Sequence, residues 1–542
     1  MGDHTRFHTR LRSSVSRQDR HAVLVFGRML LAILLVGGLL RVCLALYAHA
    51  AGDGCWHLGA VRFIAEQGRL PGSEFIGREE AFWPPPFYQI IASFFYRIGQ
   101  WFRPDNGLGD AAAKLVSPLF GTASLFVTFL IGKRLFGCRT ALASTLFTAL
   151  IPIHLYVSTL PFPDATAFFL GILAVYYALR KKVVGSGVLL GLAMVTKTNA
   201  ALFSPLLIFI TYHNLRNVRY RGKIFAKQAA MICILALAVM SPMMVRNFML
   251  FNNPVYPYLN QVFNAPQSTQ DLFTDHEPYK PVNIAKKLFG GLYLSAFGIP
   301  EGHFHKFSFL SSPYLRFLIA GWFILTALVA LPIFLGLYTL KGKQGRTLLW
   351  WIIPASVFAL MLYFIPTRGA VSIGFDTRYL LPALPAASFI WGAGFIRLVG
   401  IMQRKMLSRQ FIVIAVIILL AVSSGVIVKT AVAKSMWDFY SDDFSWVQSN
   451  TGEKSLIYTP ASECMYYNLQ RPLRFISESN IDQAFVGSSY FFVSQDFRPD
   501  NLRLSDDLYN KIMDNAILVY YNNRTGTRIY LSIRQENIKP ED

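Results

Sequence analysis

Charged residues are scarce in this sequence of 542 residues. Asp, Glu, Lys and Arg together make up 15% of the chain and hydrophobic residues 54%, whereas a soluble domain carries about 25% charged residues. This shortage excludes an ordinary soluble domain. Cysteine is also rare, since the five cysteines are scattered and form no CxxC pair. A thiolate zinc site or a disulfide framework is therefore not expected.

In place of charge, the chain has several apolar runs of roughly 18 or more residues, the length that crosses a bilayer as a helix. These runs predict an all-α polytopic membrane bundle of about 11 spans. The net charge of +22 is explained by basic residues beside the spans. Nucleic acid is not an expected partner, because no basic stripe interleaved with aromatic residues lies apart from the spans. There is no internal repeat and no low-complexity linker.

Basic patches indicate the orientation of the chain. Residues 1–25 form a basic tail without the small-residue cleavage site of a secretory signal, and we expect this tail in the cytoplasm. The first span, at about 29–47, then leads Asp53 to the outer side. Basic patches at 133–139 and 180–182 are expected inside. Asp164 lies one span from each of them and is therefore expected outside as well.

Two apolar segments cannot each be counted as one span if all the basic patches are to lie inside. Pro86–Phe102 is apolar enough for a span, but we interpret it as an interfacial or re-entrant helix on the outer face, started by Pro84–Pro86. Gly187–Ile210 is either one span or two short spans with an outer turn at 196–199. The split interpretation is favoured, because it keeps the basic stretch 216–227 inside. Helices that short survive only when they are buried among others or line a cavity.

The rest of the chain follows a regular pattern. Further spans are expected at about 224–245, 313–340, 348–365, 379–399 and 411–428. An outer loop at 246–312 is expected to contain an amphipathic stretch near 284–294. The domains are then a tail (1–25), a transmembrane catalytic domain (26–432) and a small extracytoplasmic α/β domain (433–542). Strand-like segments in the last domain lie at 455–458, 490–493, 516–521 and 528–533, and Asn522–Asn523 suggests a hairpin.

The outer face collects the acidic candidates. Asp53 and His57 are four residues apart and share one face of a helix, which suits an acid–base pair or part of a hard-metal site. The alternatives are that Asp53 caps a helix and that His57 is an ordinary interfacial histidine. Asp164 precedes the apolar segment 165–179 and can also be its cap.

Several cations accompany these acids. Lys197 lies inside an apolar segment, where a lysine needs an anion or an aqueous cavity unless its stem snorkels to the interface. Arg41, inside the first span, poses the same question. Arg378 opens an apolar helix on the outer face and is either an anchor or a phosphate ligand, because its fork suits phosphate oxygens.

A set of short motifs follows in order along the chain. Its members are Gly52-Asp53 with Trp56-His57, Pro84–Tyr88, Lys133–Gly137, Pro163-Asp164, Leu192–Lys197, Val245–Phe248, Asn253–Pro257 and Asp376–Pro382. The set resembles the GT-C superfamily of integral-membrane glycosyltransferases. It is most similar to the branch of the protein O-mannosyltransferases and the lipid A aminoarabinose transferases. The similarity covers roughly residues 29–399.

The resemblance implies transfer of a sugar from a polyprenyl-phosphate donor to an acceptor hydroxyl or amine, with inversion. The acceptor would be an envelope glycan, lipid or protein, and the enzyme would lie in the plasma membrane. In the family the first-loop acid is catalytic, which carries over to Asp53, and the second-loop acid carries over to Asp164. This chain departs from its relatives twice. Gly54 replaces a second acid, and no lysine precedes the proline motif, where Phe82–Pro84 stands.

The phosphate contact must therefore come from other cations. The candidates are Lys197, Arg378, Arg41 and Arg78, and the candidate substrate-binding residues are His57, Tyr88, Arg246 and Tyr379. A divalent metal ion is a possible cofactor, with Asp53 and His57 as the candidate ligands.

Two other classes compete with an enzyme. A secondary transporter would also have intramembrane charges and broken helices. However, no inverted repeat is visible, and the acids are expected in outer loops rather than in the middle of spans. A non-catalytic membrane assembly protein is the third class.

Overall fold

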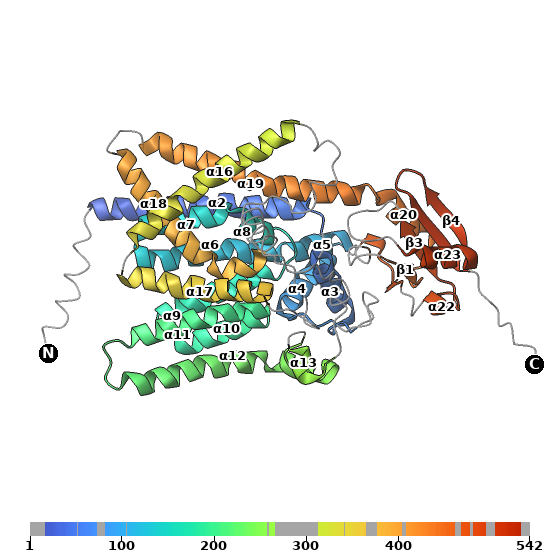
Figure 1. Cartoon of the computed structure of the whole chain (residues 1–542), viewed down its shortest axis with the longest axis horizontal. Helices are drawn as coiled ribbons and strands as arrows, with labels where there is room; N and C mark the ends of the chain where they lie inside the picture. The colour runs from blue at the N-terminus through green and yellow to red at the C-terminus, as the bar shows by residue number, and fades with distance from the viewer. Residues whose placement is uncertain are drawn as a thin grey trace, which may run out of the picture.

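The computed structural model describes the chain from Arg17 to Ser532. Its gaps are 51–52, 73–81, 104–105, 257–258, 266–312, 341, 365–376, 404–407, 461–464, 466–467, 477–480 and 495–503. Figure 1 shows a long helical bundle with a small sheet domain at one end. The helices that precede this domain are α2 (Arg17–Tyr47), α3 (Asp53–Gln67), α4 (Phe87–Phe102), α5 (Asn106–Lys114), α6 (Val116–Phe136), α7 (Cys138–Leu150), α8 (Pro152–Val157), α9 (Asp164–Leu179), α10 (Val183–Met194), η1 (Thr198–Phe203), α11 (Ser204–Asn214), α12 (Arg221–Phe251), α13 (Asn260–Phe263), α16 (Pro313–Thr339), α17 (Gly342–Phe364), η6 (Thr377–Ala383), α18 (Leu384–Gln403) and α19 (Ser408–Asp438).

Several helices are long and apolar enough to cross a membrane. Within the described residues there are five of these: Leu24–Tyr47, Gly107–Phe136, Arg221–Phe251, Leu381–Gln403 and Gln410–Ile427. Three shorter apolar helices are Asp164–Leu179, Val183–Met194 and Ile324–Thr339. The fold is therefore a polytopic membrane bundle with a small C-terminal sheet domain, as the sequence predicts.

The proline motif starts a helix that lies at the end of the bundle. α4 begins directly after Pro86 and has 16 residues, fewer than the roughly twenty that a span needs. It buries one face, including Tyr88 and Tyr96, and exposes large apolar side chains such as Phe94 and Trp101. In Figure 1, α3, α4 and α5 gather at the end of the bundle that faces the sheet domain. This arrangement fits an interfacial helix.

The segment Gly187–Ile210 is broken into two short helices, as the split interpretation predicts. α10 has 12 residues and α11 has 11, and the 3-10 helix η1 joins them after the extended residue Lys197. η1 packs against α9 because Gly171 has no side chain. A Cβ there would lie 2.2 Å from the ring of Phe203. The close approach brings the break between the short helices beside α9.

One predicted boundary is wrong. The outer loop was expected to begin at Arg246, but α12 continues to Phe251 and therefore contains Arg246. Nothing in Val245–Phe251 breaks a helix, since proline and glycine are absent there. The predicted amphipathic stretch at 284–294 lies outside the described residues.

The C-terminal domain is α/β. Its elements are α20 (Ser441–Asn450), β1 (Ile457–Thr459), β2 (Leu473–Phe475), α22 (Ile481–Ala484), β3 (Tyr490–Ser494), α23 (Asp506–Asn515), β4 (Ala516–Asn522) and β5 (Thr527–Ser532). The strands form one mixed sheet in the order β2-β1-β3-β5-β4. β1 pairs in parallel with β2 and β3, while β5 pairs antiparallel with β3 and β4. The predicted β4–β5 hairpin is confirmed, and the three-residue strand β2 was not predicted.

Two apolar cores hold these parts together. The larger core fills the bundle between α6, α7, α9, α10 and α18. A second core joins the outer-loop helices to the sheet domain, because Leu58 and Tyr88 belong to the same cluster as Trp437, Phe444 and Phe492. The C-terminal domain is therefore packed against the end of the bundle where Asp53 begins α3.

Candidate active site

Asp53 is paired with a cation from the other half of the chain. Its Oδ2 lies 2.8 Å from Nη2 of Arg378, which is the second residue of η6. The Asp53 carboxylate is half-exposed, and the Arg378 guanidinium is mostly buried. That guanidinium also lies over the ring of Phe162, 4.7 Å from its centre. Phe162 thus fixes the plane of the guanidinium and, with it, the direction of the fork.

Asp164 forms a second pair beside the first. Oδ1 of Asp164 accepts a hydrogen bond of 2.6 Å from Nζ of Lys197, and the Asp164 side chain is only 1% exposed. Asp164, Lys197 and Arg378 line one small cavity of about 10 Å³, room for about one water molecule. The two acids and two cations therefore form one cluster, contributed by α3, α9, the α10–η1 link and η6.

The proline motif supports the lysine segment through its backbone. The amide of Phe87, directly after Pro86, donates to the carbonyl of Val195 at 3.2 Å. Val195 lies two residues before Lys197 and directly follows α10 as its C-cap. The entry of α4 and the extended backbone at Lys197 are thus fixed to each other.

His57 is held by the same motif. The amide nitrogen of Gln89 donates to the carbonyls of Pro85 and Pro86 at 3.0 and 3.2 Å, and its oxygen accepts from Nδ1 of His57 at 2.7 Å. This bond fixes the tautomer with the proton on Nδ1. Burial lowers the pKa of His57 to about 4, in spite of the nearby Asp53 charge. His57 is therefore neutral at pH 7.

The electrostatics of Asp53 are set by its partner. Desolvation raises the pKa of Asp53, but the charge and hydrogen bond of Arg378, with smaller contributions from His57 and Lys197, outweigh it and hold the pKa at about 2. A carboxylate with this pKa is a weak base. Asp53 can act as a strong general base only when the Arg378 guanidinium binds another anion in its place.

In the part of the chain that the structure describes, Asp53 and His57 are engaged with partners other than a metal. Asp53 is bound to Arg378, and Nδ1 of His57 is bound to Gln89. Across the described ranges, no group of three or more His, Cys, Asp or Glu side chains could hold a metal ion.

Of the other candidate residues, the structure describes the side chains of Tyr88 and Arg246. Tyr88 is fully buried, with its hydroxyl 3.3 Å from Ser117 Oγ, and its ring packs edge-on against His57. Arg246 donates to the carbonyl of Pro71 at 3.2 Å. Tyr379 follows Arg378 in η6, and its side chain is not among those described. Arg78 lies in the undescribed range 73–81.

Arg41 lies away from this cluster. Its guanidinium is fully buried and donates to the carbonyls of Gly37 and Ala149 at 2.8 and 3.0 Å. It also lies 2.8 Å from Nδ1 of His154, whose other ring nitrogen is 2.9 Å from Ser124 Oγ. Arg41 thus connects α2 to α7 and α8, and it does not line the cavity at Lys197.

Gly54 marks a close contact at the start of α3. A Cβ at this position would lie 3.3–3.4 Å from the rings of Pro161 and Phe162. The glycine therefore lets α3 approach the Pro161–Asp164 turn, which places Asp53 near Arg378. A second acid at this position, as in many relatives, would press on that turn.

The sequence interpretation missed three features. Gln89 positions His57, and Phe162 positions Arg378. In the sequence, Gln89 has no charged residue one helical turn away and Phe162 lies between two prolines, so neither residue stands out as functional. Cys55, two residues after Asp53, is disulfide-bonded. The expectation that the cysteines support no disulfides is thus corrected, because spacing alone does not show which cysteines meet in space.

The chain is similar to known membrane transferases. A family model described as dolichyl-phosphate-mannose-protein mannosyltransferase matches residues 84–252. The fold is similar to that of ArnT from Cupriavidus metallidurans bound to undecaprenyl phosphate, with a TM-score of 0.60 and 13% identity over 95% of this chain and 98% of that one. The apo state of ArnT gives a TM-score of 0.58 and 14% identity over the same shares.

A second kind of enzyme also shares the fold. The oligosaccharyltransferase of Archaeoglobus fulgidus, in complex with zinc and sulfate, gives a TM-score of 0.51 and 12% identity. The similarity covers 92% of this chain and 73% of that one. No curated protein matches the sequence.

The matched segment and the fold indicate a glycosyltransferase, and the apolar helices are long enough to cross a membrane. The family model over residues 84–252 and the similarity in fold to ArnT support the resemblance to the O-mannosyltransferase and ArnT-like branch of the GT-C superfamily. The matched segment contains Asp164 and Lys197, whereas Asp53 and Arg378 lie outside it.

Proposed function

We propose that this protein transfers a sugar from a polyprenyl-phosphate donor to a hydroxyl or amine of an envelope glycan, lipid or protein, with inversion, on the outer face of the membrane. The observation that carries the proposal is the cluster of two acid–cation pairs, Asp53–Arg378 and Asp164–Lys197, at one end of an apolar bundle. The similarity in fold to ArnT, solved with undecaprenyl phosphate, supports a carrier of this class.

The two cations are suited to the phosphate of the donor. The guanidinium of Arg378 can bind two phosphate oxygens, while Lys197 adds a point charge. In the transfer, the acceptor atom bonds to the anomeric carbon, and the bond from this carbon to the phosphate oxygen breaks, with its electron pair leaving on the phosphate. The cations stabilise the charge that develops there. The phosphate is a weakly basic leaving group, so no general acid is needed.

Asp53 takes the proton of the acceptor. While Arg378 holds the carboxylate, its pKa is about 2. A donor phosphate that draws the guanidinium away removes the strongest influence that lowers this pKa. The base then becomes stronger only when the donor is bound, which couples activation of the acceptor to the presence of the sugar. His57, neutral and oriented by Gln89, lines the same face of α3.

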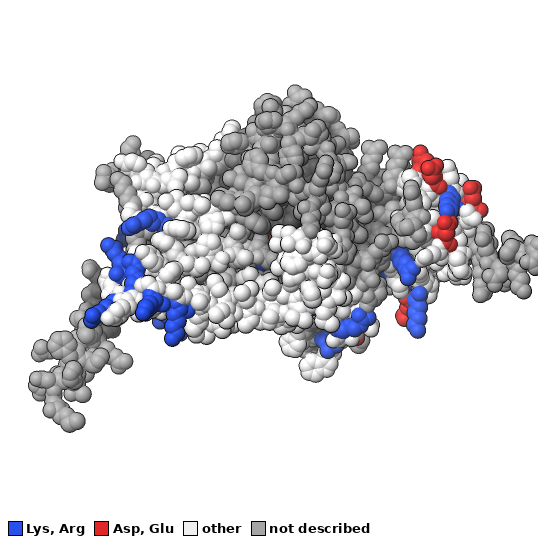
Figure 2. Space-filling model, turned by 60° about the horizontal axis from the view of Figure 1, so that its bottom comes forward, with Lys and Arg blue, Asp and Glu red and all other residues white. Residues whose placement is uncertain are grey.

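Two observations support the outer face as the location. Disulfides persist in oxidising compartments, and Cys55 is disulfide-bonded. In Figure 2, the end of the bundle away from the sheet domain shows Lys and Arg without Asp or Glu, whereas the sheet-domain end shows charges of both signs. The positive-inside rule then assigns the basic end to the cytoplasm.

The first test measures the carrier contact. We expect Arg378→Met to weaken binding of a short-chain prenyl phosphate by roughly tenfold to a hundredfold, the scale of a charge-assisted hydrogen bond. Arg41→Met is the control, because Arg41 is a buried cation outside the cavity. Its affinity for the probe should be unchanged. Binding of the probe to both variants is measured by calorimetry in detergent. Unchanged binding by Arg378→Met together with weakened binding by Arg41→Met would assign the phosphate site to Arg41 instead.

The second test measures topology. Cys43 and Cys233 are replaced by Ala, so that Cys138, at the start of α7, remains as the inner reference. Ser445→Cys on the exposed face of α20 adds an outer reporter. An impermeant maleimide should label Cys at 445 in intact cells and Cys138 only after lysis. Labelling in the reverse order would overturn the proposed orientation.

A competing transporter is tested by activity. Purified protein should transfer a labelled sugar from a polyprenyl-phosphate sugar to an envelope extract in detergent, where no sealed compartments exist. A transporter would be inactive in detergent and would move the label only across the membrane of sealed liposomes.

A further inference from the structure

A second and larger cavity lies where the outer-loop helices meet the C-terminal domain. It has a volume of about 330 Å³ and is lined by residues that include His49, Arg62, Asp110, Trp437, Gln448 and Asn468. Binding pockets for small molecules have volumes of about 300–1,000 Å³. We call it the junction cavity. It shares no lining residue with the small cavity at Asp164 and Lys197.

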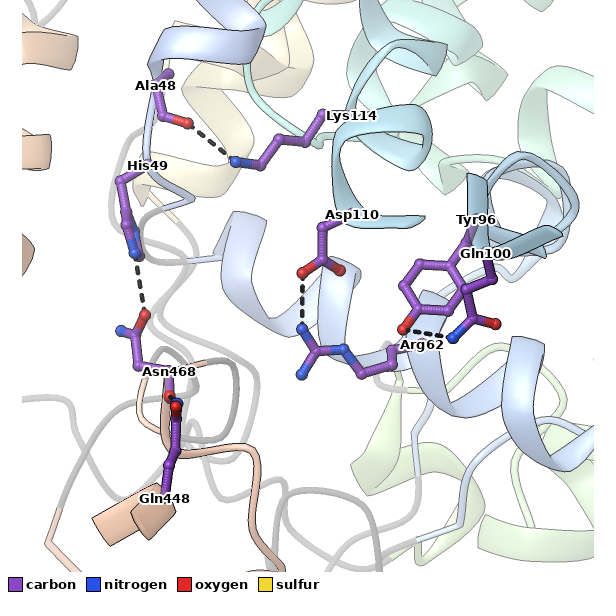
Figure 3. Close-up of polar contacts among 9 residues, drawn as sticks. All are labelled: Ala48, His49, Arg62, Tyr96, Gln100, Asp110, Lys114, Gln448 and Asn468. Carbon is purple, nitrogen blue, oxygen red and sulfur yellow. Dashed lines mark hydrogen bonds and ion pairs between the residues drawn. The ribbon is translucent and has the colours of Figure 1, made fainter. Parts of the chain in front are cut away.

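The junction cavity is built by hydrogen bonds across the domain boundary. His49, directly after α2, has Nε2 within 3.0 Å of Asn468 Oδ1 in the C-terminal domain. Gln448 of α20 donates to the backbone carbonyl of Asn468 at 2.7 Å. Lys114 donates to the carbonyl of Ala48 at 3.1 Å, which holds the segment before His49. Figure 3 shows these contacts around one space, together with the pair between Arg62 and Asp110.

The charged side chains that line the cavity are paired with one another or with a neighbour. Arg62 and Asp110 form a buried ion pair of 2.7 Å, in which both side chains are less than 10% exposed. The carboxylate of Asp438 is paired with Lys434 one turn earlier in α19. A phosphate or carboxylate ligand would compete with these pairs, so a neutral ligand fits this cavity best.

The lining combines rings with hydrogen-bonding side chains. Trp437 stacks on His49 with 5.7 Å between ring centres, and Phe444 of α20 also lines the cavity. The amides of Gln448 and Asn468 lie beside these rings. Oδ1 of Asn468 is hydrogen-bonded to His49, and Nδ2 of Asn468 is buried without a partner among the described residues.

A neutral ligand with apolar ring faces and many hydroxyls meets these conditions. A sugar ring packs its C–H face on an aromatic ring, while its hydroxyls exchange hydrogen bonds with planar amides. The position also relates the cavity to the reaction, because α3 supplies both Asp53 and Arg62. Nine residues of helix place them about 14 Å apart along the axis, which is more than one sugar ring.

We propose that the junction cavity binds a neutral sugar unit of an oligosaccharide acceptor, remote from the group that receives the transferred sugar. The identification of this sugar as part of the acceptor rests on the proposed function, whereas binding of the sugar can be measured without turnover. The C-terminal domain would then take part in acceptor binding, because residues of α20 and Asn468 line one side of the cavity.

The test measures sugar binding without catalysis. The full-length protein in detergent is applied to immobilised neutral disaccharides of glucose, galactose, mannose and N-acetylglucosamine. Ser441→Tyr places a ring in the cavity from an exposed position at the start of α20, without removing a core contact. Ser445→Tyr is the matched control, because Ser445 is exposed one turn later and does not line the cavity.

We expect the wild-type protein to bind at least one of these disaccharides. Ser441→Tyr should weaken that binding at least tenfold, and Ser445→Tyr and Asp53→Asn should leave it unchanged. Absence of binding to every disaccharide, or equal binding by Ser441→Tyr, would overturn the inference. Loss in Asp53→Asn would place the sugar at the reaction site instead, which also overturns it. If sugar binds as expected but no transfer is found in the activity assay, the proposed function fails and the cavity assignment stands.

Discussion

Replacement of Asp53 by Asn is expected to lower kcat by about 10²-fold or more, the scale of a general-base contribution. The amide keeps the shape of the carboxylate but cannot accept the proton of the acceptor. Folding should be retained, because the Asp53 side chain is half-exposed at the start of α3. Initial rates with saturating donor measure kcat, and the donor should bind at least as tightly as to the wild type, since the amide holds Arg378 less strongly than the carboxylate does.

The pH dependence gives this prediction a sharper form. The profile of kcat/KM reports the free enzyme, in which the pKa of Asp53 is about 2. Asp53 is therefore ionised over the whole practical pH range, and its acid limb lies below that range. Arg378→Met removes the main cause of the low pKa, so the limb should move upward, toward or above the ordinary value of 3.8.

Asp506→Asn serves as a control for Asp53→Asn. Asp506 is an exposed acid in the first turn of α23, far along the chain from the cluster. It should have wild-type kcat and an unchanged pH profile. A near-normal kcat in Asp53→Asn would instead reduce Asp53 to a partner that positions Arg378.

The membrane class and the split helix could be predicted from sequence because both follow from local composition. A long run of apolar residues by itself predicts a membrane span. The basic stretches on either side of Gly187–Ile210 are both expected inside, so the chain between them must cross the membrane an even number of times. The break between α10 and α11 overlaps the predicted turn at 196–199, but the 3-10 helix η1 itself was not predicted. By contrast, the end of α12 at Phe251 could not be predicted, because a charged Arg246 does not itself end a helix.

The members of the acid–cation cluster could be predicted, but their pairing could not. Asp53 and Arg378 are separated by 325 positions in the sequence, and the fold alone brings them to 2.8 Å. Arg41 shows the reverse case. A buried arginine suggests an anion, yet its contacts are with carbonyl oxygens and with His154. Carbonyl groups leave no recognisable pattern in a sequence.

The pair of Lys197 and Asp164 allows the most demanding stability prediction. The Asp164 side chain is 1% exposed, and its Oδ1 lies 2.6 Å from Lys197 Nζ. Methionine keeps the apolar stem of Lys197, but the substitution leaves the buried Asp164 carboxylate without its cation. Breaking a buried pair from one side costs about 3–5 kcal/mol, so Lys197→Met should be strongly destabilised.

The double variant Lys197→Met/Asp164→Asn separates stability from phosphate binding. It removes both charges and should recover most of the lost free energy of unfolding, measured by denaturant titration in detergent beside both single variants. If Lys197 also binds the donor phosphate, this stable double variant should still bind a short-chain prenyl phosphate about 1.5–3 kcal/mol more weakly. Asp164→Asn alone should bind it at least as tightly as the wild type, because Lys197 is then released from its carboxylate. Full affinity in the double variant would show that Lys197 serves only to neutralise Asp164, and the phosphate would then depend on Arg378.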